Sequence, residues 1–303
     1  MKKTYHLCWS AGKGLLFRCH EDFIRGINCL CITAYMTGST LLAYSFMSNH
    51  VHICIRTESL DAFIRKFRYS YTRYFNGKYN RRGMLGEKEF FCLEINGLYH
   101  LLTAIAYILR NPMHHGITGT PFGYKYSSIR AIFRKDMGHE DMSDILPEKS
   151  EYLHLPSHQS LPSHFYMDRH GMILPECAID VTDVEHQFST ARTFLYYMNR
   201  LSGEKWEAEQ QEDNSTHPPI TLKDIETGVI YQDHITMLRN EHGRGNYNAP
   251  TDTDICLEID SFISQKFGKQ SIYELSNKEK SVIRELLVRK HHLPIAQIDR
   301  CLS

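Results

Sequence analysis

The strongest constraint on the fold is an alternation of two hydrophobic periods in the first third of the chain. Four segments alternate with the period of two that is typical of half-buried strands: 4–10, 40–47, 50–56 and 89–95. Three segments between and after them carry apolar side chains at helical spacing: 21–36, 60–76 and 98–110. Asn111-Pro112 is expected to end the last helix, because proline disfavours the helical conformation in the residue before it. The order β-α-β-β-α-β-α with short connections predicts an α+β domain built on one largely antiparallel sheet.

The rest of the chain divides by composition. We expect the first domain to cover residues 1–135, an acidic linker 136–164, and a helical middle region with polar loops 165–250. The spacing of apolar residues in 251–303 predicts a mainly α-helical C-terminal region. Within it, Ser276 and Glu279 match a capping box. Its last two predicted helices resemble part of a helix-turn-helix, with a plain helical hairpin as the alternative.

The formal net charge of zero conceals two opposite halves. Residues 1–135 hold 19 Lys and Arg against 7 Asp and Glu, whereas residues 136–250 hold 8 against 20. A basic first half favours an anionic partner, with nucleic acid as the default, although a solvated surface partly neutralised by the acidic middle is the alternative. The acidic residues 136–250 could also cover a basic groove by mimicking DNA.

Two further features bear on the cell compartment. No apolar run approaches the ~20 residues that a membrane helix needs, so no membrane partner is expected. The chain has nine cysteines, an odd number, and most lie in apolar patterns, which favours small buried side chains in a reducing compartment. These features predict a cytoplasmic protein, associated with the nucleoid if its partner is DNA.

Two short motifs carry the chemistry. His50 and His52 share one side of their predicted strand and could clamp a divalent metal, although taken alone they are more often a partly buried pair. Tyr107 and Asn111 lie one turn apart on their predicted helix. A tyrosine hydroxyl can attack phosphorus when a metal polarises the phosphate, and an amide oxygen could be a third ligand; the alternative for Tyr107 is a core aromatic. Two adjacent histidine pairs are interpreted as chance: His114-His115 and His291-His292.

A segment rich in basic and aromatic residues, 65–82, follows the predicted strand that carries His50 and His52. Cations can track phosphates while aromatic rings stack on unpaired bases. Tyr74, within this segment, is the second candidate for the nucleophile, but Lys78 rather than an amide or carboxylate stands four residues later. The cations predicted to contact DNA are Arg65, Lys66, Arg68, Arg73, Lys78, Arg81, Arg82 and Arg110.

Three segments together resemble the REP-associated tyrosine transposases, which are single-tyrosine HUH nucleases related to the insertion sequence 200 transposases. The segments are Ser-Asn-His-Val-His-Ile at 48–53, Tyr-Thr-Arg-Tyr-Phe-Asn at 71–76 and Tyr-Ile-Leu-Arg-Asn-Pro-Met at 107–113. The resemblance covers about residues 4–133 and includes an aromatic-Ser-Ser closure at 126–128. It implies a ferredoxin-like or RRM-like domain.

The same resemblance implies an activity and a set of site residues. It implies cleavage of single-stranded DNA near hairpins through a 5′-phosphotyrosine, with Mg²⁺ or Mn²⁺ as the cofactor. Matched residue by residue, the metal ligands are His50, His52 and Asn111, and the nucleophile is Tyr107. The implied partners are single-stranded DNA with hairpins and, if two subunits share a site, a second copy in a homodimer. A catalytically inactive, domesticated DNA-binding protein or repressor is the alternative function, and a metal-dependent RNA nuclease is a weaker one.

Overall fold

The N-terminal elements follow the predicted order. The computed structural model describes residues 2–138, 154–156, 160–199, 250–291 and 293–303. The sheet has the strand order β2-β3-β1-β4, and each neighbouring pair is antiparallel. This confirms the predicted α+β class with a largely antiparallel sheet. The elements are β1 (Lys3–Ser10), α1 (His20–Met36), β2 (Thr40–Phe46), β3 (His50–Thr57), α2 (Leu60–Lys78), β4 (Phe91–Ile95) and α3 (Leu98–His114).

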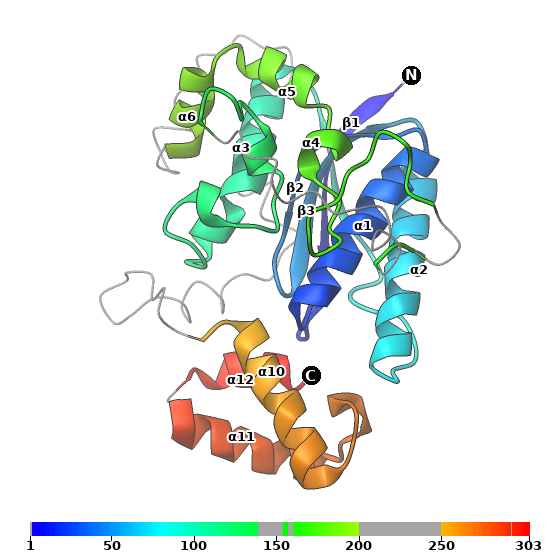
Figure 1. The fold of residues 1–303 in the computed structure, drawn as a ribbon, viewed down its shortest axis with the longest axis vertical. Helices are drawn as coiled ribbons and strands as arrows, with labels where there is room; N and C mark the ends of the chain where they lie inside the picture. The colour runs from blue at the N-terminus through cyan, green and yellow to red at the C-terminus, as the bar shows by residue number, and fades with distance from the viewer. Residues whose placement is uncertain (1, 139–153, 157–159, 200–249, 292) are drawn as a thin grey trace.

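The two sides of the sheet are covered by different helices (Figure 1). Trp9 of β1 contacts the rings of Phe67 and Tyr71, so α2 lies over the odd-numbered side of β1, and α1 packs beside α2. The side chains of the opposite parity face α3, as the contact between the rings of His52 and Tyr107 indicates. The sheet therefore separates an α1–α2 layer from an α3 layer.

Helix α3 is longer than predicted. It continues through Pro112 to His114, so the expectation that Asn111-Pro112 ends the helix is wrong. Pro112 lies near the C-terminus of α3, where its missing N–H costs one intrahelical hydrogen bond. Every residue from 100 to 112 is buried, and this burial offsets the local preference against a helix at Asn111.

The described part of the predicted middle region packs on the N-terminal domain. The backbone N–H of Asp180 donates to the carbonyl of Leu41 on the edge strand β2 at 2.8 Å. Val184, Phe188 and Phe194 belong to the same hydrophobic core as the sheet. Outside the described residues lie 139–153 and 200–249. Most of the predicted acidic linker and polar loops fall in these two ranges, and so does most of the segment predicted to mimic DNA. The helices of this part are η1 (Pro121–Gly123), η2 (Ile129–Ala131), α4 (Pro175–Ala178), α5 (Val181–Phe188) and α6 (Ala191–Asn199).

The C-terminal helices lie together at one end of the N-terminal domain (Figure 1), and their buried side chains form a second hydrophobic cluster that also includes Leu15. The predicted capping box is present, because the Glu279 carboxylate accepts from the Ser276 backbone N–H at 2.7 Å and the Ser276 hydroxyl accepts from the Glu279 N–H at 3.4 Å. No helix among the described residues is long and apolar enough to cross a membrane. The elements are α10 (Asp252–Phe262), a π-helical continuation η4 (Ile263–Phe267), η5 (Ile272–Glu274), α11 (Asn277–His291) and α12 (Ile295–Cys301).

Two buried polar contacts dock these helices on the N-terminal domain. Arg18, only 1% exposed, donates to the carbonyl of Cys301 at 2.8 Å and pairs with Asp260 at 3.0 Å. The Ser48 hydroxyl donates to the Asp252 carboxylate at 2.7 Å. Ser48 belongs to the turn between β2 and β3, so the C-terminal helices contact the turn that precedes His50.

Candidate active site

His50 begins β3 and faces the end of α3. Its Nε2 lies 3.0 Å from the Asn111 Oδ1, and its Nδ1 lies 2.8 Å from the Asn49 Oδ1. All three side chains are at least 95% buried. The extension of α3 beyond the predicted end keeps Asn111 within the helix, and this contact brings together two predicted ligands that are 61 residues apart.

His52 lies on the same side of β3, and its neighbour is a histidine of β1. The register pairs Cys8 with His52 and Cys54 with His6, and the His6 Nε2 lies 3.0 Å from the His52 Nδ1. Burial lowers the pKa of His6 to about 3. Burial, followed by the neighbouring histidines, holds the pKa of His52 well below its ordinary value. Both rings are therefore neutral at physiological pH, which is the protonation state that a metal ligand requires.

Tyr107 completes the group from α3. Its ring centroid lies 5.4 Å from that of His52 and 5.9 Å from that of His6, and both contacts are edge-on. The ring centroid of His114, two turns later on α3, lies 6.1 Å from that of Tyr107. Tyr107 is 5% exposed and belongs to the hydrophobic core. The tyrosine thus packs as a core aromatic and lies against the histidines at the same time.

The donor atoms can be tested for their fit to a metal. With both amides oriented as in the structure, His50 donates its Nδ1 proton to Asn49, so a lone pair of His50 Nε2 faces the Asn111 Oδ1, which is also an acceptor. This arrangement suits a cation close to both atoms, whereas a rotated Asn111 amide or a second proton on His50 makes the same contact a hydrogen bond. Cis ligands of an octahedral Mg²⁺, each at about 2.1 Å from the ion, also lie about 3.0 Å apart. His50 and Asn111 therefore fit two ligand positions.

His52 fits the third position if its tautomer is the one that His6 can support. When His52 donates its Nδ1 proton to the His6 Nε2, the His52 Nε2 lone pair becomes the ligand, and His6 orients the ring from behind. Within the described ranges, no group of three or more His, Cys, Asp or Glu side chains could hold a metal ion. The candidate set consequently depends on the Asn111 amide.

The predicted DNA-contacting cations do not gather at this group. All but Arg110 belong to α2 or to the loop after it, and α2 covers the other side of the sheet (Figure 1). Lys78 pairs with Glu21 at 2.8 Å and with the buried Asp22 at 2.9 Å, so it joins α2 to α1. Arg68 donates to the carbonyl of Lys88, and Arg81 donates to the carbonyl of Met84 at 2.8 Å. The exposed cations of the set are Arg65, Lys66, Arg73, Lys78 and Arg82, of which Lys78 is held in the two ion pairs described above, while Arg110 is buried on α3.

Tyr74 is separated from the histidines by the sheet. Its hydroxyl donates to the Asp22 carboxylate at 2.9 Å, and burial, followed by the Asp22 charge, raises its pKa. The structure therefore does not bring Tyr74 together with His50 and His52.

Three neighbours of the site were not found from the sequence. His6 and Asn49 hydrogen-bond the two predicted ligand histidines, and the His115 ring centroid lies 5.2 Å from that of His50. From the sequence, His114-His115 is interpreted as a chance pair, and the structure places both rings next to the candidate site. The sequence does place His6 on a predicted strand of alternating pattern. Only the pairing of β1 with β3, and its register, shows that His6 lies beside His52.

The chain is similar to solved structures that include a transposase. A solved structure of a REP-associated tyrosine transposase bound to a REP hairpin is 14% identical to this chain, with a TM-score of 0.38. The alignment covers 46% of this chain and 81% of that chain. No family model matches the chain, and no curated protein matches it.

Proposed function

We propose that this chain is a metal-dependent transposase or nickase that cuts and rejoins single-stranded, hairpin-associated DNA through Tyr107. The observation that carries the proposal is the convergence of β3 and α3. It brings two histidines, an amide oxygen and a tyrosine ring into one buried group. These are the residue types that phosphodiester transfer by a tyrosine needs, and the excess of basic residues in the first 135 residues suits a nucleic-acid substrate.

The proposed step is an in-line displacement at phosphorus. The phenol oxygen of Tyr107 forms a bond to phosphorus while the bond to the 3′-oxygen breaks. The phenol loses its proton and the departing 3′-oxygen gains one, which leaves a 5′-phosphotyrosine and a 3′-hydroxyl. The 3′-hydroxyl of a second strand reverses this step and rejoins the DNA.

The residues around Tyr107 have separate roles in this proposal. His50, His52 and Asn111 would hold Mg²⁺ or Mn²⁺, and the bound ion supplies Lewis-acid polarisation of the scissile phosphate. Edge contacts with His6 and His52 and a tilted contact with His114 hold the Tyr107 ring, so its direction is set before DNA arrives. A DNA strand bound at this site could reach the exposed cations of α2 only by passing around an edge of the β-sheet.

The decisive experiment is a test for a covalent adduct. The protein is incubated with Mn²⁺ and single-stranded hairpin oligonucleotides, and the products are separated on a denaturing gel. We expect a gel-stable adduct that chelation and His50→Ala abolish and that Tyr107→Phe removes. Tyr74→Phe is the matched control, because it removes a hydroxyl from a helix on the other side of the sheet and should leave the adduct intact.

Two results would count against the proposal. An adduct that persists in Tyr107→Phe would exclude this nucleophile. Tight binding of hairpins without an adduct from any of them would favour the alternative of a catalytically inactive DNA-binding protein or repressor. One observation favours that alternative: the His50 and Asn111 donor atoms already lie in contact with each other.

A further inference from the structure

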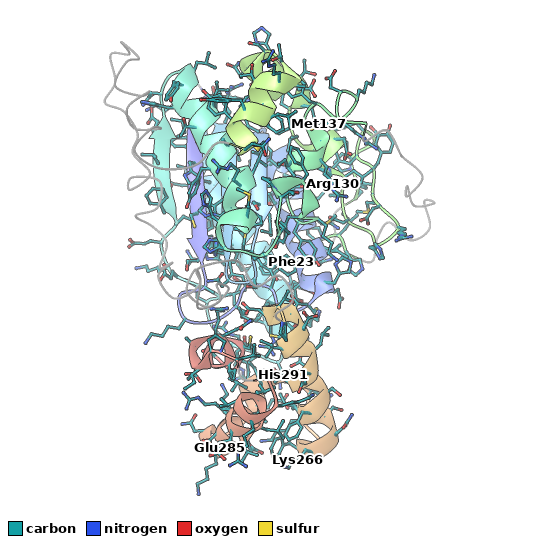
Figure 2. The ribbon with its side chains drawn as sticks, turned by 90° about the vertical axis from the view of Figure 1, so that its left-hand side faces the viewer. Phe23, Arg130, Met137, Lys266, Glu285 and His291 are labelled. Atoms are coloured by element: carbon teal, nitrogen blue, oxygen red, sulfur yellow. The ribbon has the colours of Figure 1, made fainter. Side chains whose placement is uncertain are left out.

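A cavity of about 670 Å³ lies between the N-terminal domain and the C-terminal helices. His50 and His115 line it, so the cavity adjoins the candidate active site directly. The side formed by the N-terminal domain includes Phe23 of α1 and Arg130, and Figure 2 shows Phe23 on the part of the domain nearer to α10 and Arg130 farther from it. Thr253 of α10 belongs to the opposite wall, which means that the cavity exists only when the C-terminal helices are docked.

The wall of the N-terminal domain combines aromatic rings with cations. The rings of Phe23 and Tyr126 are stacked with centroids 3.9 Å apart, and the Tyr126 hydroxyl lies 2.7 Å from the His20 Nδ1. The Lys125 Nζ lies 4.8 Å from the Tyr126 ring centroid. Lys125 and Arg130 are exposed, and the Arg130 Nε donates to the Phe122 carbonyl at 2.9 Å, which orients its guanidinium. Phe23 is 2% and Tyr126 7% exposed, so the wall offers a narrow apolar strip beside two cations, which suits a ligand that has a flat ring at one end and an anion at the other.

The wall of the C-terminal helices is polar and carries the negative charge of Asp254. Asp252 and Arg300 form a bidentate pair at 2.8 and 2.9 Å, so their charges cancel. The Asp254 carboxylate accepts from Thr251 at 2.7 Å within the capping box of α10. The half-buried Thr253 between them adds a hydroxyl that can both donate and accept, as the edge of a nucleobase requires.

We propose that this cavity binds one nucleotide of the single strand whose scissile phosphate lies at His50. The base would lie along the Phe23–Tyr126 wall, and the adjoining phosphate would lie at Lys125 and Arg130. The volume is within the range of about 300–1,000 Å³ that is usual for small-ligand sites. The identification of the ligand as DNA rests on the proposed function, whereas the cavity and its lining do not. The C-terminal helices then act as the second wall of a substrate site.

The test uses the full chain and the four deoxynucleoside 5′-monophosphates, with binding followed by ligand-observed NMR without metal. Thr253→Trp should fill the cavity from α10. Leu257→Trp is the matched control, because Leu257 is 55% exposed one turn later on the same helix and does not line the cavity. We expect at least one monophosphate to bind the wild type and Leu257→Trp equally, and to bind Thr253→Trp about 5- to 140-fold more weakly, the range that loss of one stacked base implies.

A second variant guards against misfolding of the first. Lys125 and Arg130 are on the surface, so their double substitution by alanine should leave the fold intact and still weaken nucleotide binding. The proposal is overturned if no monophosphate binds the wild type, if Thr253→Trp binds as the wild type does, or if inorganic phosphate competes as well as the nucleotide. Nucleotide binding that survives while no Tyr107 adduct forms would overturn the proposed activity and leave the binding site standing.

Discussion

The carboxylate of Asp252 should be the main polar support of the packing of α10 against α12, and it also contacts the N-terminal domain through Ser48. It accepts four hydrogen bonds: from Ser48 Oγ at 2.7 Å, from Gln297 Nε2 at 3.1 Å, and from Arg300 at 2.8 and 2.9 Å. Removing one partner of a buried ion pair costs about 3–5 kcal/mol, because the other charge stays buried without compensation. We therefore expect Asp252→Ala to destabilise the packing of α10 against α12 by about 3–5 kcal/mol, and to remove the one hydrogen bond of this carboxylate that reaches the N-terminal domain.

The assay is hydrogen exchange of the amides in α10 and α12 at neutral pH, where a loss of this size accelerates exchange through local opening by more than about 100-fold. Asp299→Ala is the control on α12, because the Asp299–Arg284 pair is 49% and 44% exposed. A surface pair of this kind contributes about 0–1 kcal/mol. If Asp252→Ala changes exchange no more than Asp299→Ala does, the reasoning about buried charge at this contact is refuted.

The same carboxylate predicts how this contact depends on pH. Burial alone would raise the pKa of Asp252, but the Arg300 charge and the hydrogen bonds outweigh it, so the pKa lies below its ordinary value of 3.8. A lowered folded-state pKa means that the stabilisation is complete above the unfolded value and disappears as pH falls through the folded one. The difference between the wild type and Asp252→Ala should therefore be constant from about pH 5 to 8 and shrink below about pH 4. A difference that grows on acidification would contradict this assignment.

Four further predictions follow from other sites. Asn49→Ala should weaken Mn²⁺ binding about 10- to 100-fold in a calorimetric titration, because it removes the acceptor that orients His50; unchanged affinity would remove Asn49 from the site. Gly26→Ala should lower the stability of the protein in urea unfolding, because the new Cβ would lie 2.5 Å from the Phe17 Cε1 and overpacking costs about 1–3 kcal/mol. This cost opposes a gain of about 1 kcal/mol in helix propensity. A more stable variant would contradict the prediction. Arg18→Met should weaken the docking of the C-terminal helices on the N-terminal domain by about 3–5 kcal/mol, because it leaves the Asp260 carboxylate partly buried without its counter-charge. Hydrogen exchange in α10 that matches the wild type would show that Arg18 does not support the docking. If the exposed cations of α2 and of the loop after it contact phosphates, each alanine substitution should lower the slope of log affinity against log salt by about 0.7 for single strands, and an unchanged slope would exclude that residue as a contact. The residues to test are Arg65, Lys66, Arg73 and Arg82.

The sequence by itself determined the elements of the first domain and the local parts of the site. Hydrophobic period is a local property, so the strand and helix order could be predicted from it and agrees with the structure. The same local geometry put His50 and His52 on one side of a strand, and Tyr107 and Asn111 one turn apart on a helix. The end of α3 could not be predicted in this way, because burial across the helix outweighs the local effect of Pro112.

Only the tertiary structure decided which of these parts meet. The period of a helix shows that one of its faces is buried but not which side of a sheet it covers, so nothing local put α3 over the histidines and the cations of α2 on the other side. The register of β1 against β3 brings His6 to His52, and a network around Asp22 makes Lys78 a structural residue. The contact between Ser48 and Asp252 joins positions 204 residues apart. Such pairings depend on how whole elements pack and on the entropy of closing long loops, and neither is carried by a short stretch of sequence.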